Sequence, residues 1–275
     1  MPGVGPRPLS GRVAVVTGAN HGIGAATAAS LAGLGADVAI AYLAYTPTDH
    51  DPGRPDVYRT QREQGPEDTV AAVESEGCRA IAVEADLTDA AAPARIFAEA
   101  EAALGPVSIL VNNASAWRKD TFAPGQGDPL RRHHDQLTGE TALAQLLVDA
   151  RGGALMIAEL AASVRRHDLG WGRIVGLTSG GSMGFPGEVS YGAAKAALDN
   201  YTMSASAELA ADGITANVVH PPVTDTGWVT DEVRAFVQQS HEHHHVAQPA
   251  EVAEVIAWLC TDDARLVTGN VLRLR

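Results

Sequence analysis

The chain has 275 residues, of which 45% are hydrophobic and 19% are charged. Such a composition is typical of a folded globular protein and excludes disorder as the main state. With 33 acidic and 20 basic residues the formal net charge is -13, so the protein would repel a phosphate backbone, and nucleic acid is excluded as a general partner.

The cysteine content and the lack of long apolar runs indicate the cellular compartment in which we expect the protein. Cys78 and Cys260 can form at most one disulfide, and no charged-then-apolar leader precedes the first strand-like run. No apolar stretch approaches the roughly 20 residues that a membrane span requires. We therefore expect a cytoplasmic protein that does not associate with membranes, and whose core is large enough to fold without a metal or a disulfide.

Short apolar runs alternate along the chain with longer segments that are rich in Ala and Leu and have a helical period. The runs are apolar at nearly every position, as in strands buried on both faces of a parallel sheet. The predicted strands are Val13 to Thr17, Val38 to Tyr42, Ala80 to Glu84, Ile109 to Asn112, Ile174 to Thr178, Thr215 to Val219 and Val271 to Leu274. The predicted helices are Ile23 to Leu34, Thr69 to Glu76, Ala91 to Leu104, Leu143 to Arg165, Tyr191 to Leu209 and Pro249 to Leu259.

This order predicts one α/β domain over residues 1–275, a doubly wound parallel sheet (Rossmann fold) of about seven strands with helices on both faces. Two irregular insertions interrupt it. Residues 44–67 hold four prolines together with Arg54, Arg59 and Arg62, which predicts a loop with one helical turn. Residues 117–141 include a Pro- and Gly-rich stretch followed by a basic one, and loops longer than about 12–15 residues are usually functional or disordered.

The segment from Thr17 to Gly24 reads TGANHGIG and lies where the first predicted strand ends and a helix begins. Glycines at such a turn let the backbone approach a diphosphate, and the helix presents free N–H groups and the positive end of its dipole to the anion. The motif alone also fits an ordinary Gly-rich turn. Its position between strand and helix favours dinucleotide binding.

Lys195 follows Tyr191 by four positions at the start of a predicted helix. This spacing places the lysine ammonium beside the phenol. The chain has only two lysines and five tyrosines, so a chance pair at this spacing has a probability of about 4%. A nearby cation lowers the pKa of a phenol from about 10 toward neutrality, where general acid/base catalysis is efficient.

A hydroxyl-rich segment, Thr178 to Ser182, follows the predicted strand that ends near Leu177. A hydroxyl at the carboxyl end of a parallel strand faces the ligand crevice of a doubly wound sheet. Ser179 is the preferred candidate from strand register, with Thr178 and Ser182 as alternatives. The segment also fits an ordinary Ser/Gly-rich loop start.

Taken together and in this order, the motifs resemble those of the short-chain dehydrogenase/reductase family, and the resemblance spans Gly11 to about Leu274. The family implies a nicotinamide dinucleotide bound across the strand ends and a hydride passing between its ring and a carbonyl or alcohol carbon. The segments that carry the resemblance are Thr17 to Gly24, Asp86-Leu87, Asn112 to Ser115, Ser179, Tyr191 with Lys195, Asn217, Pro221 to Thr226 and Val267 to Gly269.

By this resemblance, Tyr191 donates a proton to the carbonyl oxygen, Ser179 orients that oxygen, and Lys195 lowers the pKa of Tyr191 while holding the cofactor ribose. The family also implies a substrate lid near residues 226–247 and a homo-oligomer, either a dimer or a tetramer, built from the long helices and the last strand. The cofactor-binding residues that the resemblance implies are Gly18, Asn20, His21, Gly22, Ile23, Gly24, Tyr42, Asp86, Leu87, Asn113, Ala114, Tyr191, Lys195, Pro221, Thr224 and Thr226.

The chain departs from the family pattern at three places. Family members usually have an asparagine that holds a proton-relay water near the lysine, and the matching register here falls on Asp149, whose charge opposes formation of the phenolate. The family's Pro-Gly after the sixth strand is Pro221-Pro222, which reshapes the nicotinamide-side loop because proline lacks an N–H. Ser179 lies 12 residues before Tyr191, one fewer than is common.

The choice of nicotinamide cofactor depends on the end of the second strand. An acidic residue there accepts hydrogen bonds from the ribose hydroxyls in NAD-preferring members, but this chain has Tyr42 and Leu43. His21 occupies the motif position where a cation would bind a 2′-phosphate. We expect NADP in preference to NAD, with the phosphate held by Arg54, Arg59 or Arg62.

Two other features suggest properties of the substrate pocket. His241, His243, His244 and His245 are clustered in the chain, but adjacent histidines on a helix rarely form a closed metal site, so no metal is predicted. Trp117 and Trp228 follow strand ends, where they could wall a pocket for an aromatic or polycyclic substrate or simply fill the core.

The leading hypothesis is therefore an NAD(P)-dependent oxidoreductase acting on a carbonyl, an alcohol or an imine of a bulky organic substrate, in the manner of secondary metabolism. One alternative is a dinucleotide-binding sensor or scaffold without redox turnover, motivated by Asp149 and Pro222. Another uses the bound cofactor structurally, with Tyr191 driving dehydration or cyclisation.

Overall fold

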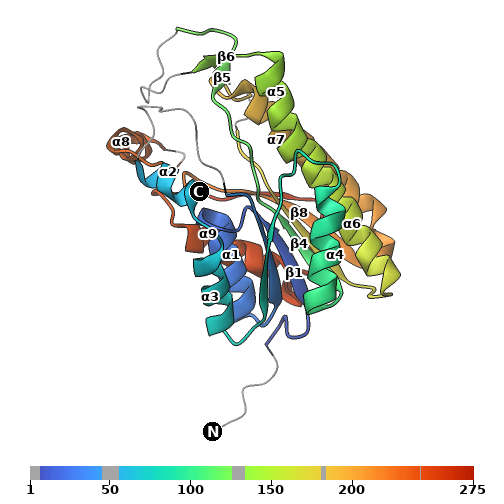
Figure 1. The fold of residues 1–275 in the computed structure, drawn as a ribbon. Coiled ribbons are helices and arrows are strands. Elements are labelled where there is room, and N and C mark those ends of the chain that lie inside the picture. The colour runs from blue at the N-terminus through green and yellow to red at the C-terminus, as the bar shows by residue number, and fades with distance from the viewer. Residues whose placement is uncertain (1–6, 45–55, 126–133, 181–183, 242) are drawn as a thin grey trace.

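The computed structural model describes residues 7–44, 56–125, 134–180, 184–241 and 243–275. Its centre is a seven-stranded sheet in the order β3-β2-β1-β4-β7-β8-β9, in which every neighbouring pair is parallel (Figure 1). This confirms the predicted Rossmann-type fold. The strands are β1 (Val13–Thr17), β2 (Asp37–Tyr42), β3 (Ala80–Glu84), β4 (Val107–Asn112), β7 (Gly172–Leu177), β8 (Ile214–His220) and β9 (Val271–Arg273).

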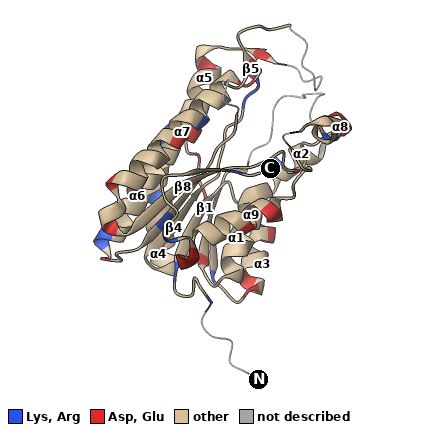
Figure 2. Ribbon diagram, turned by 180° about the vertical axis from the view of Figure 1, so that it is seen from behind, with Lys and Arg blue, Asp and Glu red and all other residues tan. Residues whose placement is uncertain are grey.

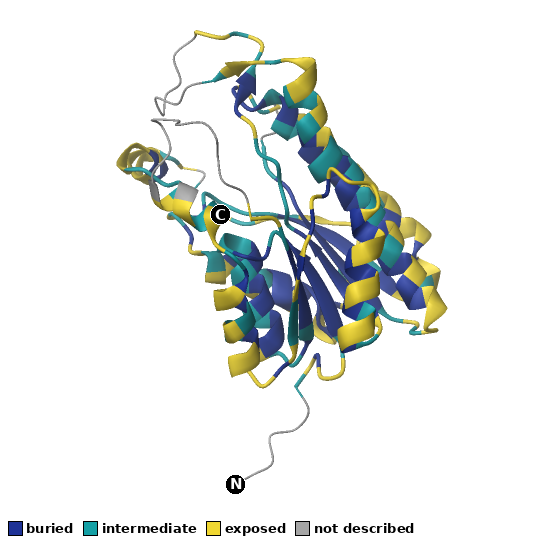
Figure 3. Cartoon of the chain, viewed as in Figure 1, coloured by how far each residue is buried: buried dark blue, intermediate teal, exposed yellow. Residues whose placement is uncertain are grey.

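Helices cover both faces of the sheet because its strands bury alternate side chains on opposite sides. Val13 and Val15 of β1 pack into one apolar cluster, and Ala14 and Val16 pack into the other. Figure 3 shows the sheet as the buried centre of the molecule. One face carries α1 (Gly22–Gly33), α3 (Glu67–Ser75) and α9 (Pro249–Leu259), and the other carries α4 (Ala92–Leu104), α6 (Gly153–Arg166) and α7 (Val189–Glu208).

The strand order reverses at β1, which lies between β2 and β4. Ligands of doubly wound sheets bind outside the carboxyl ends of the strands at such a reversal. The loops that follow β1 and β4 therefore lie at this reversal, and each of these loops carries one of the motifs identified in the sequence.

The insertion at residues 44–67 is more helical than predicted. Residues 45–55, including Arg54 and three of the prolines, lie outside the described residues, but α2 (Asp56–Glu63) is a two-turn helix. The expectation of a loop with one turn was wrong because the prolines lie on either side of a stretch that has neither proline nor glycine.

The insertion at residues 117–141 holds a small parallel pair, β5 (Asp120–Thr121) and β6 (Asp135–Gln136), followed by α5 (Gly139–Gln145). Residues 126–133, which include part of the predicted basic stretch, lie outside the described residues. The region expected to form a lid contains α8 (Asp231–Gln239), whose first turn is capped by the Thr230 hydroxyl.

The predicted helix from Leu143 to Arg165 is not one regular helix. Between α5 and α6 the chain forms a π-helical segment, Leu146–Gly152, with Asp149 at its centre. Such segments occur often at functional sites because they redirect side chains without ending the helix.

Many of the charged residues lie on the outer surfaces of the helices (Figure 2), but a few are buried, among them Asp120, Asp149 and Lys195. Within the described part of the chain, no helix combines the length and the apolarity needed to cross a membrane.

Candidate active site

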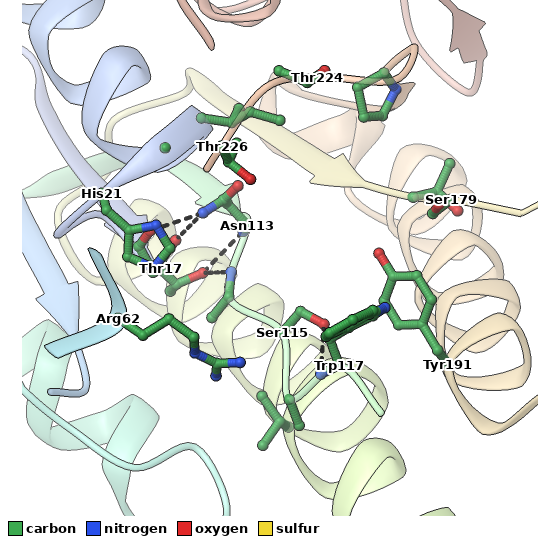
Figure 4. Close-up of a pocket in the computed structure, with 18 of the residues that line it drawn as sticks. Thr17, His21, Arg62, Asn113, Ser115, Trp117, Ser179, Tyr191, Thr224 and Thr226 are labelled. Carbon is green, nitrogen blue, oxygen red and sulfur yellow. Dashed lines mark hydrogen bonds between the residues drawn. The ribbon is translucent and has the colours of Figure 1, made fainter. Parts of the chain in front are cut away.

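A cavity of about 800 Å³ opens at the carboxyl ends of the strands, and residues that follow β1, β2, β3, β4, β7 and β8 line it. Figure 4 shows Ser179 and Tyr191 toward one end of this cavity and His21 with Arg62 toward the other. Most of the predicted cofactor-binding residues line the wall, namely Gly18, Asn20, His21, Gly22, Ile23, Tyr42, Asp86, Leu87, Asn113, Ala114, Tyr191, Pro221, Thr224 and Thr226.

The glycine loop is held by the residues that follow β4. The Asn113 side-chain amide donates hydrogen bonds of 2.9 Å to the carbonyls of Thr17 and Gly18. The Thr17 hydroxyl in turn accepts the backbone N–H groups of Asn113 and Ala114, both at 3.0 Å. The side chain of Asn113 therefore stabilises the loop, and its neighbours form the cavity wall.

This loop fits the diphosphate of a dinucleotide. Helix α1 begins at Gly22 without a side-chain cap or an acidic residue in its first turn, and Gly22 and Ile23 line the cavity, so this end of the helix suits an anion. Gly18 and Gly22 have φ angles of 62° and 58°, and a Cβ on Gly18 would lie 2.9 Å from the Ala114 Cα. The loop therefore needs glycine to bring its backbone this close to a ligand.

Gly24 lies behind the cavity wall and makes the tightest approach. A Cβ there would lie 2.2 Å from the Gly18 carbonyl oxygen. We expect Gly24→Ala to destabilise the protein by about 1–3 kcal/mol and to weaken dinucleotide binding. Thermal unfolding and cofactor titration measure both effects. Gly139→Ala is the matched control, because a Cβ at Gly139 meets no atom within 4 Å; equal behaviour of the two variants would contradict the prediction.

Residues that follow β2 and β3 form one wall of the cavity, where the family resemblance places the adenine. Asp86 is exposed, and its carboxylate accepts the Thr88 backbone N–H at 2.8 Å, while Leu87 is buried. Tyr42 ends β2 at the same wall. The Asn20 side chain donates to the Gln64 carbonyl at 2.9 Å, so it ties the glycine loop to the segment that follows α2.

Three arginines, Arg62, Arg118 and Arg273, also line the cavity. Arg62 is carried by α2 and lies close to His21, whose pKa is lowered to about 4 first by burial and then by the Arg62 charge. The cavity near the glycine loop therefore has a neutral His21 beside a guanidinium. The side chain of Arg59 is not described, so only Arg62 of the three predicted candidates can be placed.

Helix α7 presents Tyr191 to the cavity and buries Lys195 behind it. The ammonium lies 5.5 Å from the centre of the Tyr191 ring, as the four-residue spacing predicts. Lys195 is 2% exposed and is not part of the cavity wall, so its expected contact with the cofactor ribose stays a prediction.

Ser179 and Thr178 have different environments, which bears on the choice between them. The Ser179 side chain lines the cavity at the same end as Tyr191 and lowers the pKa of the phenol (Figure 4). The Thr178 hydroxyl is buried and donates to Asp199 at 2.9 Å. These contacts favour Ser179 as the residue that orients a substrate oxygen; Ser182, the other alternative, lies outside the described residues.

Asp149 contacts Lys195 directly. Its Oδ1 lies 2.9 Å from Lys195 Nζ, and both side chains are almost fully buried. Its Oδ2 accepts the Gln145 side-chain amide at 2.8 Å and the Ala116 backbone N–H at 3.0 Å. A fixed carboxylate thus pairs with the lysine at the register where the family has asparagine.

The electrostatics of Tyr191 differ from the expectation of a depressed pKa. Burial raises the pKa of the phenol above its ordinary value, and Lys195 acts against this. The negative charges of Asp149 and Glu188 raise the pKa further, while the Ser179 hydroxyl lowers it. Lys195 itself has a raised pKa, because Asp149 and then Tyr191 outweigh its burial. Lys195 therefore stays charged, but Asp149 offsets much of its effect on the phenol.

The loop after β8 carries Pro221, Thr224 and Thr226 into the cavity wall. Despite Pro222 in place of glycine, the loop is ordered by local bonds: the Thr224 hydroxyl donates to the Pro222 carbonyl, and the Trp228 indole N–H donates to the Thr224 carbonyl, both at 2.9 Å. A Cβ on Gly22 would lie 3.1 Å from the Thr226 side chain, so this loop packs closely on the glycine loop.

Trp117 forms part of the cavity wall and is linked to α7. Its indole N–H donates to the Glu188 carboxylate at 2.7 Å, and Tyr58 of α2 meets its ring edge-on at a centroid distance of 6.0 Å. Phe185 lies 5.7 Å from the Tyr191 ring. Sequence reasoning missed Tyr58, Phe185 and Glu188, although Glu188 precedes Tyr191 by one helical turn, a spacing that could have indicated it.

The histidines of the cluster have different environments. His243 lines the cavity and packs near Phe236, whereas His245 bonds Glu251 at 2.9 Å. Among the described residues, no group of three or more His, Cys, Asp or Glu side chains is arranged to hold a metal ion.

Comparisons with known proteins agree with this geometry. A family model described as Enoyl-(Acyl carrier protein) reductase matches residues 56–274. The chain is 35% identical over 267 residues to cis-4-hydroxycyclohexanecarboxylate dehydrogenase of Sinomonas cyclohexanicum, covering 95% of this chain and 94% of that protein.

Two solved structures extend the likeness to the whole fold. A short-chain dehydrogenase/reductase of Serratia marcescens has a TM-score of 0.76 at 29% identity, over 97% of each chain. The angucycline C-6 ketoreductase LanV with bound NADP has a TM-score of 0.75 at 28% identity, over 97% of this chain and 95% of that one. The matches favour redox turnover over a sensor, a scaffold or a dehydratase. The protein belongs to the short-chain dehydrogenase/reductase family and is an oxidoreductase that uses a nicotinamide cofactor.

Proposed function

We propose that the protein reduces the carbonyl group of a bulky, ring-containing ketone with NADPH, within a single domain that spans residues 1–275. The observation that carries the proposal is the set of aromatic side chains that line the cavity together with Tyr191, namely Trp117, Phe185, Tyr58 and Trp228. Such a wall favours planar apolar rings over small polar substrates. LanV, a ketoreductase, has the same fold.

In this proposal the substrate oxygen lies between the hydroxyls of Ser179 and Tyr191. Ser179 donates a hydrogen bond that orients the oxygen, and Tyr191 transfers its proton to it. Because the pKa of Tyr191 is raised, the phenol keeps its proton at neutral pH and is ready to act as an acid. The glycine loop and the first turn of α1 would hold the dinucleotide, whose nicotinamide would supply the hydride to the carbonyl carbon.

Lys195 and Asp149 act behind the phenol. The ammonium stabilises the phenolate that remains after proton transfer, and Asp149 fixes the ammonium in place through its 2.9 Å contact. The aromatic wall excludes water from the reacting atoms, which strengthens these electrostatic effects.

The proposal is tested by mixing the purified protein with NADPH and a panel of ketones that ranges from acetone to fused-ring aromatic ketones. We expect consumption of NADPH that increases with ring size. NADPH binding without consumption across the panel would favour a non-redox role and overturn the proposal.

The preference for NADP rests on Arg62. The guanidinium lies near His21 and at the same cavity wall as Tyr42, and the residues at the end of β2 include no acidic side chain that would repel a 2′-phosphate. A cation placed there can bind a phosphate through charge-assisted hydrogen bonds.

We expect Arg62→Gln to weaken NADPH binding by about 10-fold to 100-fold, since a hydrogen bond to a charged group contributes about 1.5–3 kcal/mol. Binding of NADH, which lacks the 2′-phosphate, is expected to change little. Tryptophan fluorescence titration with each cofactor measures both. Arg95→Gln, which removes an exposed arginine on α4, is the control. An equal loss for NADH and NADPH would show that Arg62 only supports α2.

We also propose that the protein forms a homo-oligomer with copies of itself. Leu143, Leu146 and Tyr201 are exposed on the segment from α5 into the π-helical turn and on α7, and β9 is an edge strand with Val271 exposed. Exposed apolar side chains and an open strand edge favour association. We expect light scattering to give a mass of two or four chains, and a monomer at micromolar concentration would contradict this.

A further inference from the structure

The insertion at residues 117–141 is attached to the first turn of α7 by a buried carboxylate. Asp120 of β5 is 0% exposed. Its Oδ1 accepts the Ser190 backbone N–H at 2.9 Å, and its Oδ2 accepts the hydroxyls of Ser190 and of Thr141, the latter at 2.8 Å. One carboxylate therefore joins β5, α5 and α7.

This arrangement is costly and specific. Removing a carboxylate from water costs several kcal/mol unless its oxygens accept hydrogen bonds. The Asp120 carboxylate accepts three, which offset this cost. One of these donors is a backbone N–H at the positive end of a 20-residue helix, where negative charge is stabilised. Glu188, the residue at the N-cap position of α7, makes no side-chain cap bond, so Asp120 caps the helix from a distant part of the chain.

The bond acts on the residue that directly precedes Tyr191. A second link, from the Trp117 indole to Glu188, joins the same two segments one turn away. Residues 117–120 and residues 188–191 are thus fastened at two points. Any shift of the insertion would move the turn that carries Tyr191.

We propose that Asp120 is a positioning residue for Tyr191, through which the insertion holds the phenol in register with the substrate oxygen. The proposal rests on the proposed carbonyl reduction. A misplacement of about 1 Å at a reacting group can lower the rate by about 100-fold, so a fixed first turn bears directly on turnover.

The variants Asp120→Ala and Asp120→Asn test this. Alanine removes all three bonds, and we expect kcat to fall by about 10-fold to 100-fold, with the affinity for NADPH unchanged. Asparagine keeps an acceptor for the Ser190 N–H, and its amide can donate to the two hydroxyls, so we expect kcat to recover to within about threefold of the parent. Glu140→Gln on α5 is the matched control, because it removes an exposed carboxylate from the same insertion.

A readout independent of turnover is the indole N–H resonance of Trp117, assigned with Trp117→Phe. We expect it to shift in Asp120→Ala and to stay unchanged in Glu140→Gln, because loss of the Asp120 link releases the segment that carries the Trp117–Glu188 bond. If Asp120→Ala is folded but leaves both kcat and the resonance unchanged, the proposal is wrong.

Two further outcomes concern a variant that does not fold and a parent protein that reduces no ketone. If Asp120→Ala does not fold, Ser190→Ala replaces it; this variant keeps the backbone bond and loses one hydroxyl, so we expect a smaller, several-fold decrease in kcat, and no decrease overturns the proposal. If the resonance shifts in Asp120→Ala but the parent protein reduces no ketone, the link between the segments stands while the proposed function, and with it the catalytic purpose of the link, fails.

Discussion

Replacing Tyr191 with phenylalanine is expected to lower the rate of carbonyl reduction by about 100-fold to 10,000-fold. This is the range of rate enhancement that a positioned general acid contributes. The substitution removes only the hydroxyl, which lies at the cavity wall on the side of Ser179. The glycine loop and the α2 side of the cavity are untouched, so NADPH should bind with nearly unchanged affinity.

Steady-state rates and fluorescence titration separate the two effects. Tyr201→Phe is the matched control, because Tyr201 lies on the same helix but is 47% exposed. Retention of most of the activity in Tyr191→Phe would exclude Tyr191 as the proton donor and would require another acid at the cavity.

Asp149→Asn is expected to shift the pH dependence of the reaction to lower pH. The negative charge of Asp149 raises the pKa of Tyr191, so its removal lowers that pKa. Alcohol oxidation needs the phenolate and should become faster at neutral pH, whereas carbonyl reduction needs the phenol and should lose activity at a lower pH than in the parent. On the rising limb of the oxidation profile, each pH unit of displacement changes the rate about tenfold.

The same substitution tests the stability of the buried pair. Breaking a buried ion pair by removing one partner costs about 3–5 kcal/mol, although asparagine keeps part of the hydrogen bonding to Gln145 and Ala116. We therefore expect a lower melting temperature together with the shifted profile. Asp263→Asn makes the same change in net charge at an exposed position. This control should change neither the melting temperature nor the pH profile. An unshifted profile in a folded Asp149→Asn protein would show that Asp149 does not act on the phenol.

Local patterns in the sequence predicted the parts of the site that are formed locally. The turn from Thr17 to Gly24 lies within one strand-helix unit, and Tyr191 and Lys195 lie one turn apart on one helix, so spacing alone was sufficient to place them. Asp149 was singled out by counting along a helix, and its carboxylate lies 2.9 Å from Lys195 Nζ even though the helix contains a π-helical segment.

The features of the site that the sequence did not predict depend on contacts between segments that are distant in the chain. The Trp117–Glu188 and Asp120–Ser190 bonds join residues 71 and 70 positions apart, and no local pattern indicates such partners. The raised pKa of Tyr191 arises mainly from burial, which depends on how distant segments, among them the one that carries Phe185, pack around it. The helix α2 was missed because the surrounding prolines obscured a short regular stretch.

The three arginines of the cavity have a consequence for how fast a dinucleotide arrives. A protein with a net charge of -13 repels an anionic ligand at long range, whereas Arg62, Arg118 and Arg273 attract it once it reaches the opening. Salt screens charges beyond about 8 Å at physiological ionic strength and screens partly buried contacts less. Moderate salt should therefore speed diffusional encounter with NADPH, in contrast to a basic protein, whose association with the same anion slows from the first addition of salt.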